Sequence, residues 1–561
     1  MSFKDKVVYQ IYPKSFMDSN NDGIGDIRGI ISKLDYLKDL GVDIIWTTPF
    51  FVSPQNDNGY DVADYYNVDP IYGSMSDVEE LIREAKNRNI DIMFDMVFNH
   101  TSTYHNWFQK ALSGDEKYKS FYIFKKGRVV NGKLEAPTNW KSKFGGSAWE
   151  YVDKFDEYYL HLFDVTQADL NWDNEEVRNE IYKIVNFWIE KGVYGFRFDV
   201  VNLISKPQVF EDDLLGGFEG DGRRFYTDGV NIHKYLKELN RNTFGRYDNS
   251  ITVGEMSSTT IDNCIKYAGE DENELSMVFN FHHLKVDYKD KDKWQLMDFD
   301  FLALKDILFS WQEGMQDGNA WSALFWCNHD QPRIVSRFGD DKRYHKESAK
   351  MLATVVHTLR GTPYIYQGEE IGMTNAYFDS IDKYRDVESI NYFNILKEKN
   401  IKEEDIYKIL SERSRDNSRT PMQWNSGNKN AGFSNASSTW IDVTHNYKDI
   451  NVEDSLKNED SILNHYKKLI KLRKEYKSIS EGRIVPLLKS DKNVLAFMRR
   501  YDELNEKILV INNFYGREVN IYLYFNIENY KCILSNYSID RDITNNMTLK
   551  PYESLVFYKN Q

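Results

Sequence analysis

Eight short apolar segments alternate with amphipathic helical segments over the first two thirds of the chain. They are Val7–Pro13, Asp43–Pro49, Asp91–Val97, Gly195–Val201, Ser250–Met256, Met277–Phe281, Ser322–His329 and Pro363–Gly368. Nearly continuous apolar strands, separated by helices such as Ile30–Leu40 and Val177–Lys191, are typical of a parallel sheet that is covered on both faces. Eight such strands predict an α/β fold in which the sheet closes into a (β/α)8 TIM barrel.

Two parts of the chain depart from this alternation. Residues 101–172 are too many for one helical crossover between the third and fourth strands, and a second long excursion, 369–455, follows the eighth. After residue 478 the pattern changes to short strands at Val485–Pro486, Val494–Arg500, Ile508–Asn513, Val519–Leu523, Tyr530–Leu534 and Ser554–Tyr558. This spacing predicts an antiparallel β-sandwich. We therefore expect a barrel of residues 1–100 and 173–478, an inserted lobe after strand 3 at 101–172, and a C-terminal β-sandwich at 479–561.

Composition argues against several classes of protein. The formal net charge is −15, from 72 basic and 87 acidic residues, whereas a nucleic-acid scaffold needs a basic surface. The cysteines Cys264, Cys327 and Cys532 are odd in number and far apart, so no disulfide framework is expected. There is no apolar leader and no run of ~18 apolar residues. We expect a cytoplasmic protein with no nucleic-acid or membrane partner, and the oligomeric state stays open.

Polar residues stand at the carboxyl ends of four predicted strands, where barrels of this kind place their active sites. The third strand ends in Asp95–His100, the fourth is Gly195–Asp199, the fifth ends in Gly254–Met256 and the seventh in Asn328–Asp330. Taken together and in this order, these segments resemble the signature regions of the α-amylase superfamily of glycoside hydrolases. The resemblance covers essentially the whole chain, including the inserted lobe and the terminal sandwich.

The resemblance implies a role for each carboxylate. Asp199 matches the family's nucleophile, Glu255 its acid/base, and Asp330 the residue that grips sugar hydroxyls and steadies the transition state. Two carboxyls about 5–5.5 Å apart suit retaining cleavage through a covalent glycosyl-enzyme. Arg197 lies two residues before Asp199 on one strand, so both point into the barrel and the arginine supplies a counter-ion. Crowding by Asp199 and Asp330 is expected to raise the pKa of Glu255 and keep it protonated.

Four further residues are expected to bind the sugar. His100 and His329 lack a third ligand at zinc spacing, so they are predicted to be neutral hydrogen-bonding partners of sugar hydroxyls. Tyr60 and Asp61, after the second strand, resemble the platform and the hydroxyl clamp that hold the terminal glucose in this family. A surface turn is the alternative for this pair.

Residues 18–26 carry a separate motif. The predicted ligands are the side chains of Asp18, Asn20, Asp22 and Asp26 and the carbonyl of Ile24, which match the first part of a calcium loop. Gly29 stands where that loop would carry its bidentate glutamate, so a plain Asn/Asp/Gly turn is the alternative. Family members with this loop hold a structural Ca²⁺ there, which implies an ion without a catalytic role. No cofactor is expected for catalysis.

Two motifs narrow the family to one branch. Gln167–Asn171 and Ser414–Trp424 resemble the oligo-1,6-glucosidase branch, which trims short α-glucosides from the non-reducing end. Gln167 is therefore expected to bind substrate. One arginine of the second motif should contact the terminal glucose, with Arg419 preferred and Arg415 as the alternative. A buried ion pair is the competing interpretation.

Within that branch, four stretches resemble the group of trehalose-6-phosphate hydrolases. They are Lys143–Trp149, Gly220–Gly229, Phe279–Tyr288 and Leu324–Arg333. The third puts Lys285 in the loop after the sixth strand, with Lys293 further along it. Relatives that act on neutral oligosaccharides tend to have an acidic residue near the position of Lys285. A phosphate dianion on the leaving glucose would need such cations in an acidic protein, although a solvated charged loop is the alternative.

The resemblance implies a phosphorylated disaccharide as the partner, with hydrolysis of α,α-trehalose 6-phosphate to glucose and glucose 6-phosphate. A neutral oligo-1,6-glucosidase is the alternative within the same chemistry. Transglycosylation or sugar isomerisation also stays open, because both depend on how water reaches the intermediate. A non-enzymatic relative is disfavoured because Asp199, Glu255 and Asp330 are all present.

Overall fold

A computed structural model describes residues 3–215 and 220–560. Eight parallel strands form the centre, namely β1 (Val8–Ile11), β2 (Ile44–Thr47), β5 (Asp91–Met96), β13 (Gly195–Phe198), β14 (Ile251–Met256), β15 (Met277–Asn280), β16 (Ala323–Leu324) and β17 (Thr362–Tyr366). They pair in the order β15-β14-β13-β5-β2-β1-β17-β16. A parallel bridge between Val278 and Ser322 joins the two ends. The predicted closed barrel is thereby confirmed, and each of the eight apolar segments overlaps one of its strands.

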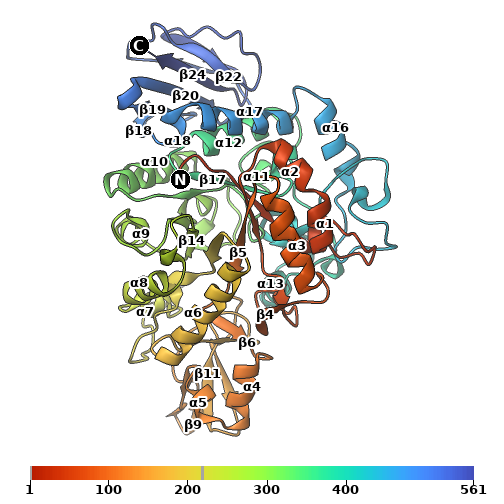
Figure 1. Cartoon of the computed structure of the whole chain (residues 1–561), viewed down its shortest axis with the longest axis vertical. Helices are drawn as coiled ribbons and strands as arrows, with labels where there is room; N and C mark the ends of the chain where they lie inside the picture. The colour runs from red at the N-terminus through yellow and green to blue at the C-terminus, as the bar shows by residue number, and fades with distance from the viewer. Residues whose placement is uncertain (1–2, 216–219, 561) are drawn as a thin grey trace.

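Helices cover the outside of the barrel (Figure 1). The main ones are α3 (Met75–Lys86), α6 (Glu175–Glu190), α8 (Ile232–Asn242), α9 (Ile261–Ala268), α10 (Phe301–Asp317), α12 (His345–Thr358) and α17 (Ile462–Glu475). The helix expected at Ile30–Leu40 is two helices, α1 (Ile27–Ser32) and α2 (Leu34–Leu40), because Lys33 leaves helical geometry at φ −108° and ψ 4°. No helix in the described ranges is long and apolar enough to cross a membrane.

The inserted lobe projects from the barrel at the end opposite the C-terminal sheets (Figure 1). At its base β6 (His100–Ser102) pairs with β12 (Gln167–Asp169). Its other elements are α4 (Asn106–Ser113), α5 (Glu116–Lys119), β7 (Phe124–Lys125), β8 (Arg128–Val130), β9 (Lys133–Glu135), β10 (Trp149–Val152) and β11 (Glu157–Leu160). Leu203 and Tyr226, from the loop after β13, pack with Trp140 and Trp149 in the same apolar core. The core of the lobe therefore includes residues far outside the range expected from sequence.

The second excursion folds back over the barrel. It carries α13 (Val387–Glu398), α14 (Glu403–Arg413) and α15 (Asp416–Arg419). Phe393 of α13 and Leu410 of α14 share a small apolar core with Trp294, which belongs to the loop after β15. This packing brings the excursion against the carboxyl-end loops of the barrel.

Two antiparallel sheets form the C-terminal unit. The larger joins β18 (Arg483–Leu487), β19 (Val494–Tyr501), β20 (Glu506–Asn513), β24 (Ser554–Asn560) and β22 (Lys531–Ser535), and the smaller joins β21 (Val519–Tyr522) and β23 (Asn546–Leu549). Ile521 and Met547 of the small sheet share a core with Leu509 and Leu555 of the large one, so the predicted sandwich is confirmed. The sequence analysis missed β23, a four-residue strand in a polar stretch.

Candidate active site

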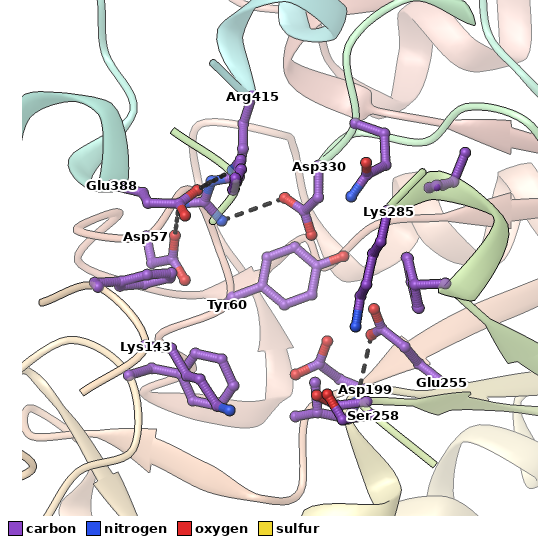
Figure 2. A pocket seen from close by; sticks show the side chains of 18 of the residues that line it. Asp57, Tyr60, Lys143, Asp199, Glu255, Ser258, Lys285, Asp330, Glu388 and Arg415 are labelled. Atoms are coloured by element: carbon purple, nitrogen blue, oxygen red, sulfur yellow. Dashed lines mark hydrogen bonds and ion pairs between the residues drawn. The ribbon is translucent and has the colours of Figure 1, made fainter. Parts of the chain in front are cut away.

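A pocket of about 270 Å³ opens at the carboxyl ends of the barrel strands (Figure 2). Of the residues predicted from sequence, its wall includes Tyr60, His100, Asp199, Glu255, Lys285, Lys293 and Asp330. Asp57, Lys143, Glu388 and Arg415 line it as well, and the sequence analysis did not single out Asp57, Lys143 or Glu388. The barrel, the lobe and the second excursion all contribute side chains to this one cavity.

Arg197 connects the carboxylates at the floor of the pocket. Its Nη1 donates to Asp95 Oδ1 and to Asp199 Oδ1, each at 2.7 Å, and its Nη2 donates to Glu255 Oε2. Only 1% of the arginine side chain is exposed. One guanidinium therefore holds Asp199 and Glu255 close together. That suits the short carboxyl separation of retaining glycosidases, about 5–5.5 Å, better than the about 6.5–9.5 Å of inverting ones.

Glu255 is in the environment of a proton donor. Burial is the largest cause that raises the pKa of this carboxyl, to about 8, and it outweighs the opposing charge of Arg197. The negative charges of Asp199 and Asp330 raise it further. Crowding by these carboxylates acts in the expected direction, but loss of water contributes more.

Asp330 is in the opposite state. Burial alone would raise the pKa of its carboxyl, but His329, Arg415 and Arg419 outweigh burial and hold the pKa well below the usual range. Arg419 Nη2 donates to Asp330 Oδ1 at 2.7 Å, and Arg415 Nη1 lies 3.2 Å from the same oxygen. Asp330 is therefore an ionised hydrogen-bond acceptor on the pocket wall.

Tyr60 and His100 form a neutral part of the pocket wall, and the fully buried His329 backs the Tyr60 ring. The rings of Tyr60 and His329 stack in parallel with their centroids 5.0 Å apart. The Tyr60 hydroxyl donates to Asp95 at 2.9 Å, and the backbone carbonyl of Tyr60 contacts His100 Nε2 at 3.1 Å. Burial lowers the pKa of both His100 and His329, so both rings are neutral. This arrangement suits a sugar ring that stacks on one face and exchanges hydrogen bonds at its edge.

Asp61 and Gln167 lie behind this wall. The Asp61 carboxylate accepts from Ser53 Oγ at 2.9 Å, from the Asn56 amide at 2.9 Å and from the Asp57 amide at 3.1 Å. These bonds occupy it in shaping the 53–61 loop, and Asp57 is the loop's carboxylate on the pocket wall. Gln167 is fully buried and donates to Asp57 Oδ2 at 3.1 Å. The structure thus places Asp57 where the sequence analysis expected Asp61, because turn geometry decides which carboxylate faces the cavity.

The structure also separates the two candidate arginines. Arg415 lines the pocket and contacts Asp57 at 3.0 Å and Asp386 at 2.6 Å. Arg419 is 1% exposed and donates to the carbonyl of His329 at 2.8 Å, which puts it one layer behind. The geometry favours the alternative, Arg415, for contact with the terminal glucose. Both belong to the short turn around α15, and sequence does not reveal which side of a turn faces a cavity.

Two lysines of the pocket wall lie near a third cation, Arg223. Lys285, in the loop after β15, and Lys143, from the lobe, enter it from different segments of chain (Figure 2). Burial and the nearby Arg223, in α7 (Arg223–Tyr226), lower the pKa of Lys285 to about 8, although over a third of this residue's surface meets solvent. Burial, Arg223 and Lys285 likewise lower the pKa of Lys143, to about 8. We call Lys143, Arg223 and Lys285 the cationic corner.

Lys293 lines the same wall but is already paired. Its ammonium lies 2.6 Å from Glu388 Oε2. The loop that carries both lysines is fixed by Asp287, whose carboxylate accepts from Arg337 Nε at 2.7 Å and also from Arg413. The predicted pair of phosphate-facing lysines is therefore split, with Lys285 in the cationic corner and Lys293 bound to a carboxylate.

None of the residues of the predicted calcium loop lines this pocket, and Asn20 and Asp22 are exposed whereas Asp18 and Asp26 are buried. Asp18 accepts from the amides of Asn21 at 2.6 Å and Gly23 at 2.8 Å, and Asp26 accepts from the amide of Gly29 at 2.6 Å as the N-cap of α1. Within the described part of the chain, no group of three or more His, Cys, Asp or Glu side chains is arranged to hold a metal. The predicted ligands also include the Asn20 side chain and the Ile24 carbonyl, which are not among those residue types, so calcium binding stays a prediction.

Comparison with known proteins assigns the chain to a family. Residues 10–482 match the family described as "Alpha amylase, catalytic domain", and residues 494–556 match "Alpha-amylase SusG C-terminal domain". The trehalose-6-phosphate hydrolase of Bacillus subtilis is 54% identical, over 99% of this chain and 98% of that protein. An oligo-1,6-glucosidase of Bacillus cereus is 48% identical over 99% of both. A crystal structure of Bacillus licheniformis trehalose-6-phosphate hydrolase superposes with a TM-score of 0.95 at 55% identity, over 100% of both chains.

Proposed function

The chain belongs to the α-amylase family of glycoside hydrolases, and we propose that it hydrolyses α,α-trehalose 6-phosphate to glucose and glucose 6-phosphate. The unphosphorylated glucose lies deep in the pocket against Tyr60 and His100, within reach of Asp57, Asp330 and Arg415. The phosphorylated glucose is the leaving group and lies toward the cationic corner. Full-length similarity to trehalose-6-phosphate hydrolases supports this substrate, and the cationic corner is the observation in this chain that carries it.

The reaction takes two displacements at the anomeric carbon. An Asp199 carboxylate oxygen attacks that carbon, the bond to the bridging oxygen breaks, and Glu255 gives its proton to the departing oxygen. Glucose 6-phosphate leaves, and glucose remains esterified to Asp199. Glu255, now a carboxylate, takes a proton from water, the resulting oxygen attacks the anomeric carbon, and the bond to Asp199 breaks. Two inversions return glucose in the α configuration.

The charge of the pocket decides between phosphorylated and neutral substrates. Burial is the main reason that the pKa values of Lys143 and Lys285 are lowered, and the positive charge of Arg223, which is itself paired with Asp221 at 2.6 Å, lowers both further. Three cations kept together in a protein of net charge −15 are stabilised when an anion binds among them. A phosphate dianion on the leaving glucose matches that requirement, whereas a neutral isomalto-oligosaccharide does not.

Kinetics on two substrates tests the proposal. The wild-type enzyme should hydrolyse trehalose 6-phosphate with a kcat/KM well above its value on isomaltose, and NMR should show α-glucose as the first-formed product. Lys285→Ala should lower kcat/KM on the phosphorylated sugar about 10- to 100-fold, the effect of losing one charge-assisted hydrogen bond, and spare a neutral aryl glucoside. Lys289→Ala, an exposed lysine of the same loop, is the matched control. A wild type that prefers isomaltose refutes the proposal.

A further inference from the structure

Glu388 adds a carboxylate to the pocket wall that also carries Lys143, Lys285 and Lys293. It lies in the first turn of α13, and Figure 2 shows it beside Asp57 and Arg415. Its side chain is 12% exposed. An unpaired negative charge at this position would repel a phosphate dianion that enters the cationic corner.

Arg415 is a poor counter-ion for this carboxylate. The arginine lies 3.6 Å from Glu388, but it contacts Asp386 at 2.6 Å, Asp57 at 3.0 Å and Asp330 at 3.2 Å. A single positive charge shared among these carboxylates leaves little to neutralise Glu388. Lys293, at 2.6 Å, is its close partner.

The pair is held rigidly from both sides. Trp294, next to Lys293, stacks on Tyr392 of α13 with ring centroids 4.5 Å apart and an interplanar angle of 20°. The Lys293 ammonium also lies 4.9 Å from the centre of the Trp294 ring. An ion pair and a ring stack, one helical turn apart on α13, thus join the loop after β15 to the second excursion. Lys293 is not free to swing toward a ligand without breaking its bond to Glu388.

We propose that Lys293 is a specificity-determining residue that acts through Glu388: it neutralises this carboxylate and so lets the cationic corner accept an anionic leaving group. The inference rests on the proposed function, since it explains how one pocket holds a carboxylate and receives a phosphate. A chain that kept Glu388 without Lys293 would have a pocket wall suited to neutral sugars. Lys285 and Lys143 contact the phosphate, and Lys293 neutralises the Glu388 carboxylate that would otherwise repel it.

A double-mutant cycle separates this role from direct phosphate binding. The readout is the ratio of kcat/KM on trehalose 6-phosphate to kcat/KM on p-nitrophenyl α-glucoside, for wild type, Lys293→Met, Glu388→Gln and the double variant. Lys293→Met should lower the ratio at least about tenfold, because Glu388 is left charged and unpaired. Adding Glu388→Gln should restore most of the loss. Lys289→Met, in the same loop outside the pocket, should leave the ratio unchanged.

Two results overturn the inference. A double variant as poor as Lys293→Met means that the lysine binds the phosphate itself, and an unchanged ratio in Lys293→Met means that Glu388 does not influence the substrate. Should Lys293→Met fail to fold, Glu388→Gln alone still decides, since freeing Lys293 should raise the ratio and a fall contradicts the inference. A wild type inactive on trehalose 6-phosphate would instead refute the proposed function.

Discussion

Replacing Glu255 with glutamine should remove the alkaline limb of the pH–rate profile. Burial is the main reason that the pKa of this carboxyl rises from 4.5 to about 8, against the opposing charge of Arg197. A rise of that size corresponds to on the order of 5 kcal/mol in favour of the neutral acid. The exclusion of water from Glu255 therefore keeps its carboxyl protonated and able to donate.

The activity assay uses a neutral aryl glucoside, so that neither the substrate phosphate nor the cationic corner titrates with it. Glu255 must be protonated to donate, so wild-type kcat/KM should fall about tenfold per unit above about pH 8. Glu255→Gln should have low activity, rescued by azide at the second displacement, without a limb in that region. If the glutamine variant keeps the wild-type limb, another group sets it and our reasoning is wrong.

Stability supplies an independent measurement of the same pKa. Between pH 4.5 and about 8 the folded state holds a proton on Glu255 that the unfolded chain has released. The contribution of this group to the free energy of unfolding therefore falls as pH rises through that window. Glutamine cannot ionise, so the Tm of Glu255→Gln relative to wild type should rise from pH 4.5 to about 8. A Tm difference that does not change with pH would contradict the raised pKa.

Three further predictions concern other parts of the molecule. Arg415→Lys should lower kcat/KM on phosphorylated and neutral glucosides by similar factors, since Arg415 orders Asp57 and Asp330 around the terminal glucose. Arg419→Lys should mainly lower Tm. Equal losses of activity in the two variants would contradict this division. Lys305→Met should destabilise the protein by roughly 1–3 kcal/mol in urea unfolding. The Lys305 ammonium, on the barrel, donates to the carbonyls of Asp491 at 3.0 Å and Val494 at 2.8 Å in the sandwich. An unchanged unfolding midpoint would refute the role of Lys305 in joining the two. EDTA should lower Tm and calcium should restore it without changing kcat, and a Tm indifferent to calcium would leave residues 18–26 as a plain turn.

Sequence reasoning was most effective where one local property repeats along the chain. Apolar segments with helices between them predicted all eight strands of the barrel, and strand ends indicated where Asp199, Glu255 and Asp330 would meet. The alternation of side chains along one strand also placed Arg197 beside Asp199, as observed. It was least effective in the loops. Asp61 and Asp57 lie four residues apart in one turn, and only the folded turn shows which carboxylate lines the pocket.

The sequence by itself determined the barrel and the sandwich, because periodicity depends on neighbours along the chain, and the resemblance to the α-amylase family indicated which carboxylates are expected to react. Only the tertiary structure decided which cations act together. Lys143, Arg223 and Lys285 come from three separate segments, and their mutual repulsion exists only once the lobe and two loops meet. The same holds for Lys293, which sequence reasoning paired with Lys285 and the fold pairs with Glu388. Electrostatic interactions depend on distance in space, and the spacing of residues along a chain does not determine that distance.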